Sequence, residues 1–444
     1  MHTQLTSIRQ RIGGRLLELE LLITACLLLI AGIGILIAEA GGQVRWVDIA
    51  IVAAFVSFFI ILSIGLALRG WGEDQIVLPL AALLSGVGMV LARRLEPDLI
   101  ARYGDIHSGI AIKQVIWVFL GSLILMLVSF VPWRLRWLRH YRYTWLLLGL
   151  LLVGLTTIVG VERNGARLWL NLGFFQLQPV EPLKILLVVY LAAYLDDHRD
   201  LIGRASYRLG PLRLPPLPYL VPIMLMWGMT IVLIIIQKDL GAALLFFAIF
   251  LAMLYLVTNR SSYVAAGLLA FSAGAAALYP IFSHVRTRVD AWRDPWADPF
   301  GGGYQMIQAL YAFANGGAVG AGLGLGNPTT VPESQTDFVF AAIGEELGLV
   351  GTLGLLLCYA LLAIQGYSIA RNARDGFQQL LAAGLTTAIV VQAFIITAGV
   401  TNLIPLTGIT LPFVSYGGSS TLINFVMIGI LLRISAAGKP PHVQ

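Results

Sequence analysis

Charged residues are scarce in this sequence. Asp, Glu, Lys and Arg together make up 12% of its 444 residues, whereas hydrophobic residues make up 58% and the mean hydropathy is +0.84. Soluble globular domains carry about 25% charged residues, so this composition excludes a water-soluble domain. Cysteine is scarce as well: the two cysteines, Cys26 and Cys358, both fall in apolar segments, which leaves no basis for a disulfide framework.

Patterns that bind zinc or nucleotides are missing too. The six histidines are scattered singly, without the Cys/His spacing of a structural zinc site. The glycine-rich run GAVGAGLGLGNP at 317–328 has neither the preceding strand nor the following acidic residue of a dinucleotide site, so we expect no nucleotide cofactor. The net charge of +6 arises mostly in short loops, which favours contact with anionic lipid headgroups and argues against nucleic acid as a partner.

What the sequence does contain is a series of long apolar segments. Most are 18–25 residues long and lack charge, enough for a helix to cross a hydrocarbon core of roughly 30 Å. We therefore predict an all-α polytopic membrane protein with about twelve transmembrane helices. The predicted spans are residues 21–39, 49–68, 75–92, 114–132, 143–161, 182–195, 216–237, 240–257, 263–281, 347–370, 380–401 and 415–432.

The distribution of basic residues predicts the orientation. More of them fall in cytoplasmic loops if the N-terminus is cytoplasmic. The first apolar segment is full length and lacks a small-residue cleavage site, which indicates a retained helix and no signal peptide. Nine spans precede the loop at 282–340, so this loop is expected to be extracellular.

The loop at 282–340 interrupts the hydrophobic pattern. Five carboxylates occur in it among glycines and prolines: Asp290, Asp294, Asp298, Glu333 and Asp337. Pro295 and Pro299 restrict the backbone around Asp298, and three glycines at 301–303 permit a tight turn, so Asp298 should be presented on a shaped loop. Aspartate before proline is also a common turn former. The segment 304–313 is too short to span and predicts a re-entrant or interfacial helix.

Three further polar segments interrupt the apolar background. In QPVEPLK, Glu181 and Lys184 are three residues apart and share a helix face; charges at membrane depth indicate either a functional site or a structural ion pair. QKDLG places Lys238 and Asp239 between two spans. GITLPFVSYGGSS at 408–420 precedes the last span, where free N–H groups suit an anion such as phosphate or simply cap a helix.

These segments together resemble one family. NGARLW, QPVEPLK, DPWADPFGGGYQ, PESQTDFVFAAIGEELG and GITLPFVSYGGSS occur in the order seen in the SEDS proteins, the family of RodA, FtsW and SpoVE, over residues 78–433. The resemblance implies a core of ten helices at 73–434, preceded at 1–72 by a cytoplasmic tail and two additional helices, and followed by a short cytoplasmic tail at 435–444. It also implies a lipid II polymerase of the bacterial cytoplasmic membrane that works with a class B penicillin-binding protein.

Carried over residue by residue, the resemblance makes Asp298 the expected catalytic residue and assigns the glutamate and lysine of QPxExxK to Glu181 and Lys184. The sequence departs from the family at QPVEP, where a serine and a non-proline residue are usual, and at Lys238, where many members have proline. The full set expected to bind substrate is Glu181, Lys184, Arg167, Lys238, Gln305 and Ser415. We expect no nucleotide; a divalent cation, Mg²⁺ or Mn²⁺, bridging Asp298 and pyrophosphate is compatible with the chemistry.

The expected chemistry is a glycosyl transfer in which Asp298 acts as general base. The motifs favour a RodA-like role in elongation over division or sporulation, without deciding between them. Two other classes stay open: a lipid II transporter, which should show repeats of broken helices that are not found here, and a scaffold for a transpeptidase without catalysis of its own.

Overall fold

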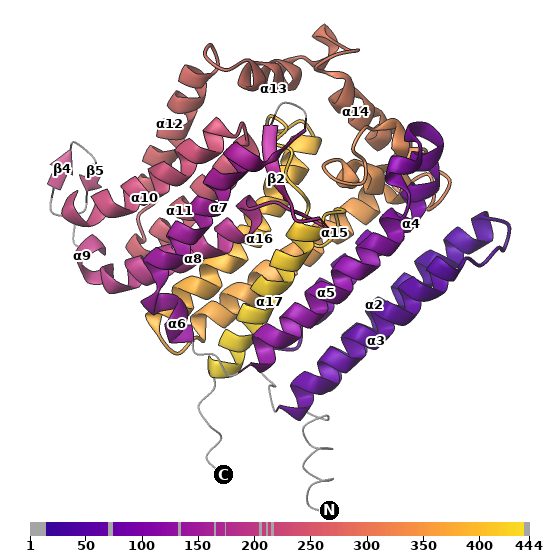
Figure 1. The fold of residues 1–444 in the computed structure, drawn as a ribbon, viewed down its shortest axis with the longest axis horizontal. Helices are drawn as coiled ribbons and strands as arrows, with labels where there is room; N and C mark the ends of the chain where they lie inside the picture. Colours follow the sequence, from indigo (N-terminus) through magenta and orange to yellow (C-terminus); the bar gives the residue numbers. More distant parts are fainter. Residues whose placement is uncertain are drawn as a thin grey trace, which may run out of the picture.

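The protein is a bundle of long helices in the computed structural model (Figure 1). The structure describes residues 15–438 except 70–73, 132–134, 164–165, 174, 204–206, 210–211 and 215–216. Helices dominate because a chain in hydrocarbon must satisfy its backbone polar groups internally. The prediction of an all-α polytopic membrane protein is confirmed.

Within the described residues, ten helices are long and apolar enough to cross a membrane. They are α2 Leu16–Glu39, α3 Trp46–Leu68, α4 Val77–Tyr103, α5 Ile110–Phe130, α7 Arg142–Val159, α11 Leu240–Thr258, α12 Ser261–Leu278, α15 Val339–Arg371, α16 Gly376–Val400 and α17 Gly418–Gly438. The two other predicted spans coincide with α8 Val180–Asp197 and α10 Leu217–Ile236. The count of twelve spans stays a prediction.

The remaining elements are short. Helical turns form α6 Leu135–His140, α9 Arg199–Gly203, η1 Asp105–His107, η2 Pro295–Ala297 and η3 Pro328–Thr330, and longer surface helices form α13 Ser283–Arg293 and α14 Tyr304–Gly316. The sequence predicted no strands, yet β1 Val161–Arg163, β2 Ala166–Asn171 and β3 Gln176–Leu177 form an antiparallel sheet, and β4 Tyr207–Leu209 pairs with β5 Leu212–Leu214. α14 confirms the predicted short helix.

The core is arranged around α4, α8, α16 and α17. In an apolar stretch of 18 residues in each helix, 83% of the residues of α16 and 89% of those of α4 are buried, but only 6% of those of α12. Helix α12 therefore lies at the periphery of the bundle (Figure 1). On α2 and α3, large side chains such as Leu27 and Ile61 point outward and are 60% and 58% exposed, as expected for surfaces that face lipid.

Helix α15 begins earlier than predicted because it is broken. The predicted span 347–370 corresponds to its second part, and a first part starts at Val339. At Gly348 the backbone adopts φ 64° and ψ −162°, a conformation that L side chains rarely adopt. Backbone groups on both sides of the break bond to the glycine-rich loop instead of to each other. The carbonyls of Glu345 and Glu346 accept from the N–H groups of Ala321 and Gly322. The N–H groups of Leu349 and Val350 donate to the carbonyls of Gly317 and Ala318.

Segment 401–417, between α16 and α17, folds back into the bundle. The Pro412 carbonyl accepts a hydrogen bond of 2.6 Å from Tyr359 on α15, and that of Thr410 accepts one of 2.8 Å from Gln392 on α16. Leu411 and Phe413 are buried. Irregular backbone at membrane depth is tolerated where protein covers it or where it lines a cavity, so this segment is a natural place for a site.

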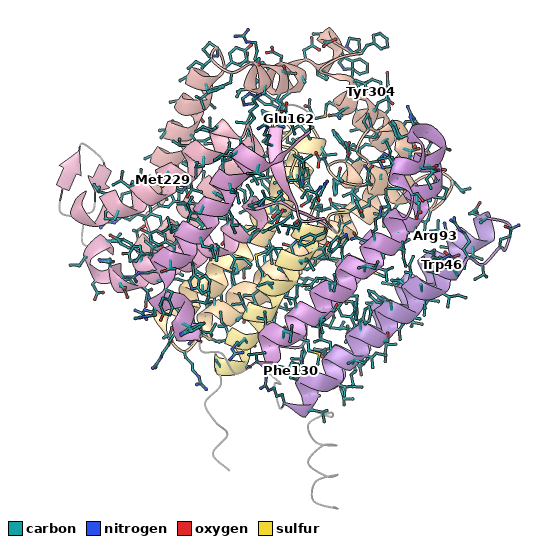
Figure 2. All side chains as sticks on the ribbon, viewed as in Figure 1. Trp46, Arg93, Phe130, Glu162, Met229 and Tyr304 are labelled. Atoms are coloured by element: carbon teal, nitrogen blue, oxygen red, sulfur yellow. The ribbon has the colours of Figure 1, made fainter. Side chains whose placement is uncertain are left out.

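The two ends of the bundle differ. Arg69 at the end of α3 and Arg433 near the end of α17 both donate to backbone carbonyls at the end of α5, which gathers these helix ends at one side. Helices α13 and α14 lie at the opposite side (Figure 1). Figure 2 shows the same division, with Phe130 near the first end and Glu162 and Tyr304 near the second.

Candidate functional site

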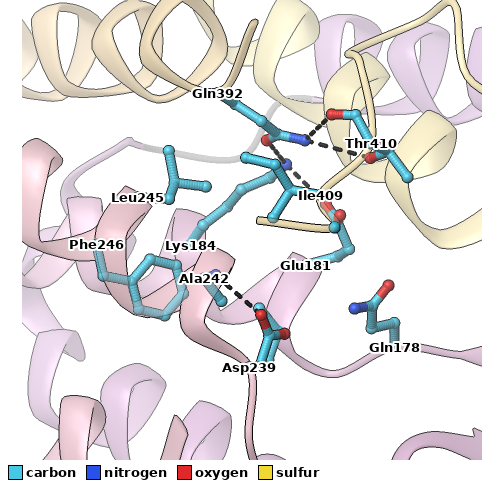
Figure 3. A pocket seen from close by; sticks show the side chains of 12 residues that line it. Gln178, Glu181, Lys184, Asp239, Ala242, Leu245, Phe246, Gln392, Ile409 and Thr410 are labelled. Atoms are coloured by element: carbon cyan, nitrogen blue, oxygen red, sulfur yellow. Dashed lines mark hydrogen bonds and ion pairs between the residues drawn. The ribbon is translucent and has the colours of Figure 1, made fainter. Parts of the chain in front are cut away.

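A cavity opens between α8, α11, α16 and segment 401–417 (Figure 3). About 30 Å³ of it is space that the centre of a water-sized molecule can occupy, and part of the cavity is open to solvent. Polar groups from four stretches of sequence line it together with apolar side chains; those used below are Gln178, Glu181, Lys184, Asp239, Gln392, Gly408 and Thr410. A small number of convergent polar groups in a mostly apolar cavity is typical of a ligand site.

An ion pair between Lys184 and Glu181 lies in the cavity wall, as the spacing of QPVEPLK allows. The Lys184 Nζ atom is 2.6 Å from Glu181 Oε2, and the two side chains are 2% and 9% exposed. Helix α8 begins at Val180, so both residues lie within its first turns on one face. An uncompensated charge at this depth would be costly, and the pair removes most of that cost.

Neutral polar side chains extend this pair into a network. Lys184 Nζ also donates to Gln392 Oε1 at 2.8 Å and to Asn424 Oδ1 at 3.5 Å, and Gln392 Nε2 donates to the Thr410 carbonyl. Thr410 Oγ1 lies 2.8 Å from Ser420 Oγ. QPVEPLK and GITLPFVSYGGSS, which are more than 200 residues apart, therefore belong to one buried hydrogen-bonded network.

QKDLG forms the turn between α10 and α11. Lys238 has φ 64°, and its N–H and that of Asp239 donate to the carbonyls of Ile235 and Ile234, so Lys238 occupies the left-handed position that commonly ends a helix. Asp239 Oδ1 then accepts a hydrogen bond of 2.9 Å from the N–H of Ala242 and caps α11. Asp239 lines the cavity, whereas Lys238 is exposed. Burial raises the pKa of Asp239.

Asp298 lies on the loop after η2, at the end of the bundle where α13 lies, and is exposed. Its Oδ2 accepts a hydrogen bond of 2.8 Å from the N–H of Gly302. A Cβ at Gly301 would lie 2.3 Å from that oxygen, so glycine is needed for the carboxylate to fold over the turn. The sequence thus explains the presentation of Asp298, which is not among the residues that line the cavity.

Helix α13 joins the Asp298 loop to segment 401–417. Arg288 Nη1 donates to the Thr407 carbonyl at 2.8 Å. Further along the helix, Trp292 Nε1 donates to the Asn402 carbonyl and Asn402 Nδ2 donates back to the Trp292 carbonyl. The loop that carries Asp298 is therefore fixed to the segment that forms one wall of the cavity.

PESQTDF meets the same segment from another side. Ser415 Oγ donates to the Thr336 carbonyl at 2.6 Å and accepts from the Leu411 N–H at 2.8 Å, while the Tyr416 N–H donates to the Gln335 carbonyl. Ser415 is buried, so its hydroxyl connects two backbone segments. Burial, reinforced by the charge of Glu333, raises the pKa of the adjacent Asp337 to about 7.

The other residues expected to bind substrate lie outside the cavity lining. Arg167 on β2 is paired across the strands with Glu162, at 3.3 Å, and both side chains are about half exposed. Gln305 is half-buried on α14. The structure brings Glu181 and Lys184 together with Asp239 and Thr410, which lie in polar segments noted in the sequence, and it adds Gln392 and Asn424, which sequence reasoning did not select. The sequence did contain an indication of Gln392 and Asn424, because both are polar amides within uncharged predicted spans.

The side chains of the protein offer few ligands for a divalent metal. Within the part of the chain that the structure describes, no group of three or more His, Cys, Asp or Glu side chains could hold a metal ion. Mg²⁺ is often held by one or two carboxylates together with substrate phosphates. The protein's own residues would therefore form only part of such a site.

Comparison with known proteins is consistent with this geometry. Residues 74–439 match the model of a family described as cell cycle protein, named after FtsW, RodA and SpoVE. The chain is 41% identical over 430 residues to "Peptidoglycan glycosyltransferase RodA" of Mycobacterium tuberculosis, covering 96% of this chain and 91% of that protein. It is 34% identical to "Probable peptidoglycan glycosyltransferase FtsW" of Geobacter sulfurreducens, over 82% of this chain and 96% of that one.

Solved structures agree with the fold. A chain from a peptidoglycan synthase complex, solved to show how polymerization and crosslinking are coordinated, superposes with a TM-score of 0.66 at 29% identity, over 82% of this chain and 97% of that one. The crystal structure of the rod shape determining protein RodA of Thermus thermophilus superposes with a TM-score of 0.57 at 26% identity, over 83% and 98%. The chain belongs to the FtsW, RodA and SpoVE family of cell cycle proteins.

Proposed function

We propose that this protein is a peptidoglycan glycosyltransferase of the RodA type, which polymerises lipid II into glycan strands for cell elongation. The main support is the buried Glu181–Lys184 pair in a cavity that segment 401–417 lines on one side. Helix α13 fixes the Asp298 loop to that same segment. The similarity to RodA proteins over almost the whole chain supports the same assignment.

Asp298 acts as general base in this proposal. Its carboxylate takes the proton from the 4-hydroxyl of the acceptor sugar as that oxygen forms a bond to the anomeric carbon of the donor. The bond between the anomeric carbon and the pyrophosphate breaks, and undecaprenyl pyrophosphate leaves, with inversion at carbon. Exposure of Asp298 on a shaped loop gives the carboxylate access to a sugar outside the bundle.

Lys184 and Glu181 have a different part. Lys184 is held by three oxygen partners, so it positions the cavity wall and supplies positive potential to a pyrophosphate leaving group. Arg167, Lys238, Gln305 and Ser415 stay in the proposal as residues near the substrate path. A divalent cation, Mg²⁺ or Mn²⁺, would be held by Asp298 together with substrate phosphates and would neutralise the charge of the leaving group.

The proposed setting is the bacterial cytoplasmic membrane. Both chain ends would lie on the cytoplasmic side, and α13, η2 and α14 on the outer side, since the first turns of α2 and the last of α17 lie opposite α13 (Figure 1). The substrate is then lipid II in the outer leaflet. A class B penicillin-binding protein is the proposed partner, because one solved neighbour comes from a peptidoglycan synthase complex.

Polymerisation of labelled lipid II by the purified full-length protein tests this function. Asp298→Asn keeps an oxygen that can accept from Gly302 but removes the base, and we expect polymer to fall by about 10²–10⁴-fold. Asp294→Asn is the matched control: Asp294 Oδ1 accepts from the Trp296 N–H, which asparagine preserves, so polymer formation should persist.

Each other outcome has a defined meaning. Unchanged polymerisation by Asp298→Asn would remove Asp298 from the mechanism. Movement of lipid II across vesicle membranes without polymer would favour a transporter, and neither activity would favour a scaffold. Depletion in cells separates elongation from division, since rounded cells indicate the former and filaments the latter.

A further inference from the structure

A pyrophosphate at the cavity needs a cation whose hydrogen-bonding capacity is not already used. An ammonium group has three N–H donors. Those of Lys184 face Glu181, Gln392 and Asn424, so Lys184 acts on a phosphate through its potential and has no N–H left for a direct hydrogen bond. Arg167 is paired with Glu162 and does not line the cavity. The structure offers another cation, Arg288, which sequence reasoning did not select.

Arg288 is fixed against the backbone of segment 401–417, next to Gly408 of the cavity lining. One arm of its guanidinium, Nη1, donates to the Thr407 carbonyl at 2.8 Å. The other arm, Nη2, lies 3.5 Å from the point where a Cβ on Gly408 would be, and Gly408 lines the cavity. Burial, Arg288 and Lys238 together lower the pKa of the nearby His284, which is consistent with positive potential at this corner.

Asp337 also approaches this point. Its Oδ2 is 3.4 Å from the Cβ position of Gly408. Although Arg288 and Asp337 are both described by the structure, no ion pair within 4.0 Å joins them among the described residues. Both side chains therefore reach the position that a Cβ on residue 408 would occupy, and glycine leaves that position open.

Building on the proposed function, we infer that Arg288 and Asp337 form an outer phosphate subsite for the pyrophosphate of a lipid-linked substrate. A phosphate oxygen placed between them accepts hydrogen bonds from Nη2 of Arg288 and from the protonated carboxyl of Asp337. Arg288, with its planar array of donors, suits phosphate in this geometry.

The protonation of Asp337 gives the subsite a pH dependence. The pKa of about 7 arises from burial first, then from Glu333 and Asp239, which raise it, against Arg288, which lowers it; these are the charged groups that face Asp337. Below pH 7 the neutral carboxyl donates to phosphate. Above pH 7 the carboxylate repels phosphate and competes for Arg288. A phosphate monoester gains negative charge as pH rises through a pKa near 6. Titration of such a ligand would therefore raise its affinity for Arg288 with pH, whereas titration of Asp337 would lower it.

Binding of undecaprenyl pyrophosphate, which carries no sugar, to the full-length protein in detergent tests the subsite without requiring catalysis. We expect Arg288→Gln to weaken its binding roughly 10- to 100-fold, the range for losing hydrogen bonds to a charged group. Undecaprenol, which lacks phosphate, should bind both proteins equally. The matched control is Arg286→Gln on the same helix: Arg286 is exposed and donates to the Pro280 carbonyl, so binding should be unchanged.

The pH dependence is the second measurement. Affinity of the wild type for undecaprenyl pyrophosphate should fall between pH 6 and 8. Asp337→Asn, whose amide donates at every pH, should keep its affinity at pH 8 and flatten the profile. Arg288→Lys retains the charge and should restore part of the binding lost in Arg288→Gln, which separates a role in binding from a role in folding.

The outcomes distinguish this inference from the proposed function. If the wild type binds the lipid pyrophosphate through Arg288 but forms no polymer, the glycosyltransferase proposal fails and the subsite stands. If Arg288→Gln binds the lipid pyrophosphate like the wild type, or loses undecaprenol equally, the subsite is overturned. Equal affinity for inorganic pyrophosphate would overturn its assignment to a lipid-linked ligand.

Discussion

Two of the buried ion pairs in the bundle differ in what surrounds them. Lys184 and Glu181 are 2.6 Å apart beside a cavity, and Gln392 and Asn424 extend the pair into a network. Arg93 on α4 and Asp48 on α3 are 2.5 Å apart, 6% and 1% exposed, and do not line that cavity. Asp48 also accepts the N–H of Arg45 and so caps its helix.

The comparison shows that burial and pairing do not by themselves mark a functional site. The Arg93–Asp48 pair joins the hairpin of α2 and α3 to the core; Figure 2 shows Arg93 near Trp46 at one end of that hairpin. The Lys184–Glu181 pair instead joins one wall of a cavity to the segment that covers it. Access to a cavity, and neutral polar neighbours, separate the second pair from the first.

The largest expected effect comes from removing one partner of either pair. Glu181→Gln and Asp48→Asn each leave a buried cation without its counterion, which costs about 3–5 kcal/mol. Both variants should unfold at a lower temperature in detergent than the wild type. A wild-type unfolding temperature for either would show that the pair contributes nothing to stability.

Replacing both partners should then separate the two pairs by activity. Glu181→Gln with Lys184→Met, and Asp48→Asn with Arg93→Met, remove all charge, and replacing a buried pair by groups of similar size is often nearly neutral for stability. Both double variants should recover much of the lost stability. We expect only the Asp48/Arg93 variant to polymerise lipid II like the wild type. Equal activity in both double variants would show that the Lys184–Glu181 pair has no role in polymerisation.

A smaller effect should follow from removing one neutral neighbour. Gln392→Leu removes one of the three partners of Lys184 and the donor to the Thr410 carbonyl, at a cost of about 1–3 kcal/mol, and should lower polymerisation as well. Ser63→Ala is the control in the hairpin, since Ser63 Oγ donates to the buried Glu18. It should lower the unfolding temperature while leaving polymer formation by the folded protein unchanged.

The smallest effect concerns pH and stability next to Gly408 of the cavity lining. The pKa of Asp337 is raised to about 7 in the folded protein, so the folded state holds this proton more tightly than the unfolded one. The resulting stabilisation is present at pH below the ordinary aspartate value and is lost as pH rises through 7. Unfolding temperature should therefore fall over this range, and less steeply in Asp337→Asn; identical slopes would contradict the shift.

The sequence predicted the helices well because length and the lack of charge are properties of each segment alone. The predicted span 347–370 matches the second part of α15. The first part, from Val339, was missed because it carries Glu345 and Glu346 and is separated from the apolar run by the break at Gly348. The Glu181–Lys184 pair was predictable from helical spacing within one element.

Contacts between distant elements were not predictable in this way. Gln392, Asn424 and Thr410 are neutral and lie in otherwise apolar segments, so nothing local to them indicates that they surround Lys184. The family resemblance marked the segments but not their contacts. The two additional helices, α2 and α3, lie before the family match at 74–439. The alignment with RodA of Mycobacterium tuberculosis covers 96% of this chain, and the remaining 4% is too short to contain both helices, so that alignment includes part of them.

The backbone hydrogen bonds between the glycine-rich loop and the break in α15 also determine how fast the amides of both segments exchange with solvent. A loop of this composition would ordinarily exchange its amide protons quickly. Here the N–H groups of Ala321 and Gly322 are bound to carbonyls of the broken helix, and those of Leu349 and Val350 to carbonyls of the loop. These four amides should therefore exchange together, at a rate set by separation of the loop from the helix. The loop would then behave in deuterium exchange as an extension of the span.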